Sequence, residues 1–205
     1  MLKNVTAVLV AGGQSKRFGS SKIIAEYKGR RLIDYAIDVL KHISDDCFIV
    51  ANFDKSEIDT SIPVFKDIIS GCGPLCGIHA ALNYADKKYV AVLPVDMPEL
   101  AFDVYRFLYP SVSDDHPAVA VSHKGLEPLV SIWPTAQLNN FEKAISENEY
   151  KLHKILKQLN AHEIELSQIM PSYQEKWFEN INYKKDLSLL ENRTQIKINS
   201  KQSAH

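Results

Sequence analysis

The sequence has few cysteines, almost no net charge and no long hydrophobic run, and each shortage excludes a class of protein. Three cysteines among 205 residues do not make a disulfide framework, so we expect a reducing, cytoplasmic compartment with Cys72 and Cys76 as small buried residues. Positive and negative side chains almost cancel, at 24 and 25, which gives no bulk attraction to a nucleic acid or an anionic membrane. No apolar run approaches the roughly 20 residues that span a bilayer. Any anion that this protein binds must be held by a local site.

The composition is that of an ordinary globular domain, with 45% hydrophobic and 24% charged residues. Strand-like and helix-like hydrophobic periods alternate along the chain, which indicates an α/β fold with a mostly parallel, Rossmann-like sheet and helices on both faces. The run Val5–Val10 is typical of a strand covered on both sides, and its lack of a small-residue cleavage site argues against a signal peptide. The other expected strands are 47–51, 62–65, 89–93, 118–121, 129–133 and 163–166, and the expected helices are 33–43, the one that Pro74 opens, 102–109, 137–146, 152–159 and 184–190.

We interpret residues 1–191 as one domain and residues 192–205 as a polar tail without a function of its own. Pro63 marks its strand as an edge strand or a strand start. Because ligands of such sheets bind beyond the carboxyl ends of the strands, the loops at those ends are where a site is expected.

Three of the eight glycines lie in the loop that follows the first strand, Val10-Ala11-Gly12-Gly13-Gln14-Ser15-Lys16-Arg17-Phe18-Gly19-Ser20-Ser21-Lys22. Glycines after a buried strand let the backbone approach a ligand, while Arg17 and Lys22 supply the cations that a polyphosphate prefers. The loop matches neither a P-loop nor a dinucleotide fingerprint. On this chemistry alone, a phosphate site and an ordinary solvated turn both stay open.

Two further loops carry similar features. A second glycine-rich stretch follows Asp67 and opens a helix at Pro74, which suits an anion or simply starts a packed helix. In Leu93-Pro94-Val95-Asp96-Met97-Pro98, a carboxylate follows a buried strand between two prolines. That arrangement is typical of a magnesium ligand, although aspartate and proline are also common in ordinary turns.

Together these motifs resemble a known family. Ala11-Gly12-Gly13-x-Ser15-x-Arg17-x-Gly19 with Lys22 resembles the opening signature of nucleotidyltransferases, most of all the molybdenum cofactor guanylyltransferases. Relatives that transfer cytidylyl groups tend to have Ala-Ala-Gly at this point. The chain departs from the pattern at Phe18 and Ser21, where the family usually has methionine and aspartate. The later elements that resemble the family are Gly73-Pro74-Leu75-Cys76-Gly77-Ile78, Pro94-x-Asp96-x-Pro98, Glu127-Pro128-Leu129 and Asn180-Ile181-Asn182, after which Tyr183-Lys184-Lys185 replaces the usual Thr-Pro-Glu.

The resemblance covers about residues 5 to 190 and implies a fold like that of nucleotide-diphospho-sugar transferases. It implies transfer of GMP from GTP to the phosphate of molybdopterin, or of its molybdenum-bound form, with release of pyrophosphate and with Mg²⁺ as cofactor. Transient contact with cofactor-insertion proteins or molybdoenzymes would follow, but no contact with nucleic acid or membrane. The implied roles are Asp96 for Mg²⁺, Lys22 and Arg17 for the β- and γ-phosphates, the backbone of Val10, Ala11, Gly12 and Gly13 together with Asn52, Asp67, Gly73 and Pro74 for the nucleotide, and Asn180 and Asn182 for the pterin.

Two alternatives stay open beside this prediction. The chain could be a related nucleotidyltransferase that uses CTP or a sugar-phosphate acceptor. It could instead be a nucleotide-binding or cofactor-handover module without catalysis, which the changes at Ser21 and after Asn182 would allow. For Asn182, an ordinary helix N-cap is as reasonable as a pterin contact.

Overall fold

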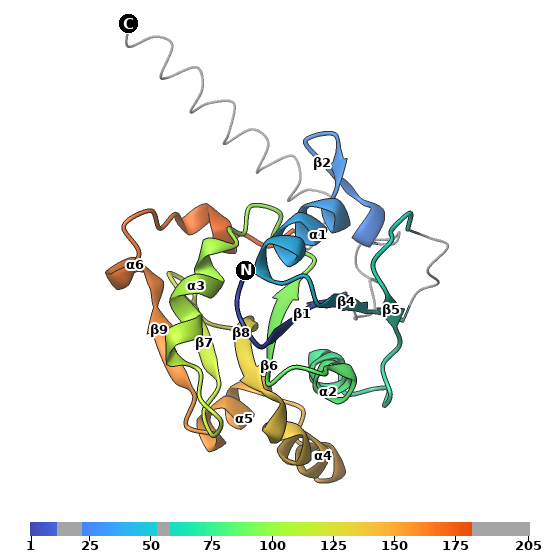
Figure 1. Ribbon diagram of the computed structural model, residues 1–205, viewed down its shortest axis with the longest axis vertical. Coiled ribbons are helices and arrows are strands. Elements are labelled where there is room, and N and C mark those ends of the chain that lie inside the picture. Colours follow the sequence, from blue (N-terminus) through green and yellow to red (C-terminus); the bar gives the residue numbers. More distant parts are fainter. Residues whose placement is uncertain (12–21, 53–57, 182–205) are drawn as a thin grey trace, which may run out of the picture.

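The computed structural model describes residues 1–11, 22–52 and 58–181, which form a seven-stranded sheet with helices packed against it (Figure 1). Its strands, in sheet order, are β5 (Val64–Phe65), β4 (Cys47–Val50), β1 (Val5–Val10), β6 (Tyr89–Pro94), β8 (Gly125–Pro134), β7 (Ala118–Ser122) and β9 (His162–Glu165). All neighbouring pairs are parallel except those that β8 makes with β6 and β7. The mostly parallel α/β sheet predicted from the sequence is confirmed.

Helices cover both faces of the sheet, and each face has its own hydrophobic core (Figure 1). On one face lie α1 (Leu32–Ile43), α3 (Asp103–Leu108) and the short α6 (Leu166–Ile169). On the other face lie α2 (Pro74–Tyr84), α4 (Leu138–Ser146) and α5 (Leu152–Gln158). Short 3₁₀ helices add to the connections: η2 (Lys22–Ile24), η4 (Tyr109–Ser111), η5 (Thr135–Gln137) and η6 (Glu175–Phe178).

The hydrophobic residues whose spacing predicted α1 are the ones that the helix buries. Its apolar residues recur every three or four positions, so they form one stripe that packs on the sheet while the charged residues face outward. The buried set is Leu32, Ile33, Ala36, Ile37, Leu40 and Ile43. α2 begins where proline is favoured, because Pro74 at its first turn has no N–H that needs an intrahelical partner.

Several element boundaries differ from the expectations. β8 is longer than predicted because it continues the turn at Gly125, and a β-bulge between Val119 and Ala120 adjusts its pairing with β7. Val64–Phe65 does form an edge strand, directly after Pro63. The segment 177–181 forms the end of η6 and an extended stretch. The expected helix 184–190 and the tail 192–205 lie outside the described residues.

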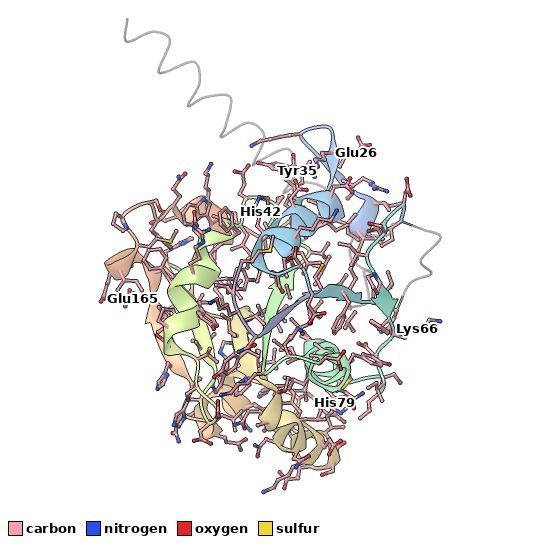
Figure 2. The ribbon with its side chains drawn as sticks, in the orientation of Figure 1. Glu26, Tyr35, His42, Lys66, His79 and Glu165 are labelled. Carbon is pink, nitrogen blue, oxygen red and sulfur yellow. A yellow bond between two sulfur atoms is a disulfide. The ribbon has the colours of Figure 1, made fainter. Side chains whose placement is uncertain are left out.

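The hairpin that precedes α1 was not predicted, and neither was the short α6. Glu26–Tyr27 (β2) and Arg30–Arg31 (β3) form a small antiparallel hairpin just before α1. In Figure 1 the β6 arrow points toward the end of the molecule that carries this hairpin. Glu26 of the hairpin and Tyr35 of α1 lie at that same end in Figure 2, and the Tyr35 hydroxyl donates a hydrogen bond to the Tyr27 carbonyl over 3.0 Å. Within the described part of the chain, no helix is long and apolar enough to cross a membrane.

Candidate active site

Three parallel strands end side by side at one edge of the sheet. Val10, the last residue of β1, is in register with Val50 at the end of β4 and with Pro94 at the end of β6. The Ala11 N–H donates a hydrogen bond to the Val50 carbonyl over 2.9 Å, so the chain enters the first loop directly beside β4. The backbone at Ala11, the side chain of Asn52 and the loop of Asp96 therefore start from neighbouring strand ends, as the parallel-sheet argument predicted.

The segment that ends at Ile181 packs against the Asp96 loop. The Ile181 N–H donates a hydrogen bond to the Asp96 carbonyl over 2.9 Å, which places Asn180 next to the same loop. The Asn180 side-chain oxygen is shielded from solvent, and no described residue donates a hydrogen bond to it. A buried acceptor without a donor is costly, so this oxygen is suited to a ligand that brings one.

The turn between β7 and β8 holds this segment from the other side. Lys124 donates hydrogen bonds to the Phe178 carbonyl over 2.8 Å and to the Glu179 carboxylate over 2.9 Å. Glu127, farther along β8, accepts a hydrogen bond from Ser122 over 2.7 Å. Burial raises the pKa of Glu127, and the negative charge of Asp96 raises it further, against the lowering effects of Ser122 and Lys124. A second carboxyl group thus lies within electrostatic reach of Asp96.

Asn52 and Asp67 form a pair on the β4 side of the site. The Asn52 amide donates to one Asp67 carboxylate oxygen over 2.6 Å, and the Asp67 N–H donates back to the Asn52 side-chain oxygen over 3.3 Å. The other Asp67 oxygen is buried and accepts no hydrogen bond from the described residues. Burial raises the pKa of Asp67, while Asn52 and the nearby His79 lower it by smaller amounts. The pair is a preformed acceptor with one oxygen still to be satisfied.

Two glycines at the start of α2 are required, each for a different reason. Gly73 has φ +61°, a left-handed conformation that L-residues rarely adopt. Gly77 has no such requirement, but a Cβ at this position would lie only 2.5 Å from Val10 Cγ1. Glycine thus brings the helix against the last residue of β1. Val10 is 3% exposed, so its side chain packs in the core and is not available to a ligand.

The cysteines at the start of α2 differ from the expectation. Both are buried, as predicted, but Cys72 and Cys76 are joined by a disulfide, so the prediction of unpaired thiols is wrong. The reason is geometric, because the turn at Gly73 and the start of α2 bring the two Cα atoms to a distance of 5.3 Å, within the range that a disulfide bridges. Cys47 is a free thiol.

His79 lies on α2 (Figure 2), and its side chain is buried. Its Nδ1 has no hydrogen-bond partner among the described residues. Burial lowers the pKa of His79 against the opposing charges of Glu142 and Asp67, so the neutral ring is favoured.

Some predicted site residues cannot be placed. Lys22 begins η2, which brings its backbone to the start of the chain leading to the hairpin. The other four lie outside the described residues: Gly12, Gly13, Arg17 and Asn182. Among the residues that are placed, no three His, Cys, Asp or Glu side chains gather to hold a metal ion. A metal at Asp96 would therefore need phosphate oxygens to complete its coordination, which is the preference of Mg²⁺.

A carboxylate that the sequence did not predict also lies near this site. Glu99 accepts hydrogen bonds from Tyr27, Lys28 and Lys176, and so joins the hairpin, the Asp96 loop and η6. No sequence pattern marks it, since its partners are 71 to 77 residues away along the chain.

Comparison with known proteins agrees with this arrangement. Residues 7–164 match the MobA-like NTP transferase domain. The chain belongs to this family. A molybdenum cofactor guanylyltransferase from Yersinia pseudotuberculosis is 31% identical over 170 residues, which cover 82% of this chain and 87% of that protein. The predicted resemblance and the assignment as a nucleotidyltransferase are confirmed.

Solved structures share the fold. The molybdopterin-guanine dinucleotide biosynthesis protein A from Archaeoglobus fulgidus superposes with a TM-score of 0.76 at 21% identity, over 93% of this chain and 98% of that one. The 2-C-methyl-D-erythritol 4-phosphate cytidylyltransferase from Thermus thermophilus gives a TM-score of 0.64 at 13% identity, over 92% and 98% of the chains. The expected likeness to nucleotide-diphospho-sugar transferases is thus confirmed for the fold of this MobA-like chain.

Proposed function

We propose that this MobA-like protein transfers GMP from GTP to the terminal phosphate of molybdopterin, with or without bound molybdenum, and releases pyrophosphate. The observation that carries the proposal is the meeting of three segments at one sheet edge. The end of β1, the Asp96 loop and the Asn180–Ile181 segment come together there from far apart in the sequence. The family and the name of the Yersinia relative support the choice of reaction.

The reaction does not need a general base. An oxygen of the acceptor phosphate attacks the α-phosphorus of GTP, and the bond between that phosphorus and the bridging oxygen of pyrophosphate breaks. The attacking oxygen is already ionised at neutral pH, so no proton has to be removed. Repulsion between anions and charge on the leaving group make up the barrier, which positioning and cationic groups lower.

Asp96 is the residue that we assign to Mg²⁺. Its carboxylate suits this hard cation, and the nearby Glu127 carboxyl adds negative potential at the same place. When bound, the metal supplies charge neutralisation across the phosphate oxygens. Lys22 and Arg17, which follow β1 in the sequence, are assigned to the β- and γ-phosphates.

Binding of the nucleotide is assigned to the β1, β4 and α2 side of the site. The Asn52–Asp67 pair leaves one carboxylate oxygen without a donor, which an N–H or O–H of the base or ribose would supply. Gly73 and Pro74, at the start of α2, are assigned to the nucleotide as well. The backbone from Val10 to Gly13 would complete the nucleotide site.

The pterin is assigned to the opposite side of the Asp96 loop. The unpartnered Asn180 oxygen lies there, and Asn182 follows it in the sequence. Contact with cofactor-insertion proteins or molybdoenzymes after transfer is part of the proposal, as is a cytoplasmic location.

The first alternative is a related reaction with CTP or a sugar-phosphate acceptor on the same scaffold. The fold alone permits it, as the Thermus cytidylyltransferase illustrates. The Ala11-Gly12-Gly13 sequence and the guanylyltransferase relative favour GTP. The second alternative, a module that binds the nucleotide without catalysis, predicts GTP binding without pyrophosphate release.

Pyrophosphate release from each of GTP, CTP, ATP and UTP, with and without molybdopterin, tests the proposal. We expect release only with GTP, molybdopterin and Mg²⁺ together. Asp96→Ala should reduce that rate about 100- to 1,000-fold, because a bound metal contributes several kcal/mol to the transition state. Asp114→Ala is the control, since it removes an exposed carboxylate paired with Lys88 at a distance from the site. A rate for Asp96→Ala close to that of Asp114→Ala would remove Asp96 from the metal role.

A further inference from the structure

We propose that Glu99 is a positioning residue for guanylyl transfer, which holds the segments that carry the phosphate, metal and pterin contacts in one arrangement. The inference rests on the proposed function, because that function assigns Lys22, Asp96 and Asn180 to the site. Glu99 itself touches none of the reacting groups in this account. It acts through the segments that it joins.

Glu99 binds donors from two distant parts of the chain. One carboxylate oxygen accepts from the Tyr27 hydroxyl over 3.0 Å and from the Lys28 ammonium over 2.6 Å. The other oxygen accepts from the Lys176 ammonium over 3.1 Å. The Glu99 side chain is only 19% exposed, and its bond to Tyr27 is partly buried, while both lysine partners keep contact with solvent. We call this set of four side chains the Glu99 clamp.

Each partner in the Glu99 clamp stands a few residues from a predicted site group. Tyr27 and Lys28 belong to the β2–β3 hairpin, which follows η2 and therefore Lys22. Lys176 belongs to η6, which leads to Asn180. Glu99 follows Asp96 by three positions. A single carboxylate thus ties together three loops that must be aligned for one triphosphate and one pterin to react.

A small apolar cluster supports the same junction. Tyr27 is 1% exposed and packs with Leu32 and Ile181, both fully buried. Ile181 is the residue whose N–H bonds to the Asp96 carbonyl. Apolar packing fixes the approach of these segments, while the directional bonds of the Glu99 clamp fix their register.

The backbone at Lys28 has a conformation that lysine rarely adopts. Lys28 has φ +51°, and Gly29 after it has φ +73°, so the two form the centre of a tight hairpin turn. Both central positions of such turns favour asparagine, aspartate or glycine, because other side chains are strained at positive φ. A lysine at the first position costs the turn some stability, and here its ammonium group is bound to Glu99.

The Glu99 clamp sets one carboxylate against two ammonium groups. Burial acts to raise the pKa of Glu99, but hydrogen bonds from Lys28, Lys176 and Tyr27 outweigh it, and the pKa is lowered. Glu99 is therefore ionised at neutral pH. A glutamine at this position keeps the shape of the side chain but loses the charge that binds the two ammonium groups.

The expected consequence is a loss of turnover more than a loss of GTP binding. Each loop still offers its own contacts to GTP when the Glu99 clamp is weakened. Alignment of the α-phosphorus with the acceptor oxygen is what suffers, and small misplacements of reacting groups are costly in the transition state. For Glu99→Gln we expect kcat to fall about 5- to 20-fold, with the KM for GTP within about threefold of the original protein.

Glu149→Gln is a matched control. Glu149 is a half-buried carboxylate that pairs with Lys154 and accepts a hydrogen bond from the Lys151 N–H, in the connection between α4 and α5. We expect this variant to keep the original kcat and to have a melting temperature similar to that of Glu99→Gln. Adding Lys176→Met to Glu99→Gln should cost little more, because the two changes break the same contact.

Two measurements decide the proposal. The first is pyrophosphate release from GTP with molybdopterin; a kcat for Glu99→Gln within twofold of Glu149→Gln would overturn the positioning role. If Glu99→Gln does not fold, Lys176→Met replaces it, because this lysine is half exposed and its side chain binds Glu99 alone among the described residues. Lys176→Met should lower kcat about 2- to 5-fold, and an unchanged kcat counts against the role.

Hydrogen exchange separates failure of this inference from failure of the proposed function. In Glu99→Gln, the amides of residues 25–31 and 177–181 should exchange faster than in Glu149→Gln, whatever the substrate of the enzyme is. If those amides do not change, the Glu99 clamp does not hold the loops. If those amides exchange faster but the original protein releases no pyrophosphate from GTP and molybdopterin, the proposed function is wrong. The Glu99 clamp would then hold the loops together, but not for guanylyl transfer.

Discussion

Gly77→Ala probes the contact on which the nucleotide side of the site is built. The added Cβ would lie 2.5 Å from Val10 Cγ1, so either α2 or the end of β1 must shift. Overpacking of this kind costs about 1–3 kcal/mol. Alanine is favoured over glycine inside a helix by about 1 kcal/mol. We therefore expect a net loss of about 0–2 kcal/mol in the free energy of unfolding, and a higher KM for GTP because Val10 leads into the first loop.

A double-mutant cycle makes the prediction sharper. Val10→Ala removes two methyl groups from a buried site and should cost about 1–3 kcal/mol. In the double variant, the new Cβ at position 77 occupies the space that Val10 has lost. The two changes together should therefore cost about 1–2 kcal/mol less than the sum of the single changes.

Urea unfolding of the original protein, both single variants and the double variant provides the four free energies. The KM for GTP should rise in Gly77→Ala and return toward the original value in the double variant. Additive free energies, within about 0.5 kcal/mol, would refute the reasoning. They would mean that α2 and β1 do not press on each other at this point.

Two further predictions concern neighbouring residues. Burial raises the pKa of Asp67, so the native state binds more protons than the unfolded state and stability falls as pH rises through that pKa. Asp67→Asn should remove this pH dependence, stabilise the protein at pH 7 and weaken GTP binding. Thermal unfolding between pH 4 and 8 measures the stability, and calorimetry with GTP measures the binding. A variant less stable than the original protein at pH 7 would contradict the prediction. For the Cys72–Cys76 disulfide, thiol titration after denaturation without reductant should find one free thiol, Cys47, and three would contradict the bridge.

Much of the fold could be predicted because its information is local. The apolar runs of β1 and β6 and the helical period of α1 are determined by burial on known faces, and neighbouring residues reveal that pattern. The order of the motifs along the chain likewise identified the family. Asp96 at a strand end follows from the architecture of parallel sheets without any knowledge of its partners.

The parts that could not be predicted depend on contacts between distant residues. The β2–β3 hairpin has only two residues in each strand, and its turn holds a lysine where the usual sequence rules favour asparagine or glycine. Glu99 has no neighbouring pattern, and its role is visible only once Tyr27 and Lys176 are seen beside it. The disulfide was missed because the number of cysteines indicates the redox compartment of a protein, and not the distance between two particular cysteines.

The central claim is that Asp96 and the loop after β1 act on one triphosphate. A crystal structure of the protein with Mg²⁺ and a non-hydrolysable GTP analogue tests it most directly. The account predicts a metal within about 2.1 Å of an Asp96 carboxylate oxygen and of the phosphates, with Lys22 on the same triphosphate and the nucleoside beside Asn52 and Asp67. A triphosphate bound elsewhere, or a metal held without Asp96, would contradict it.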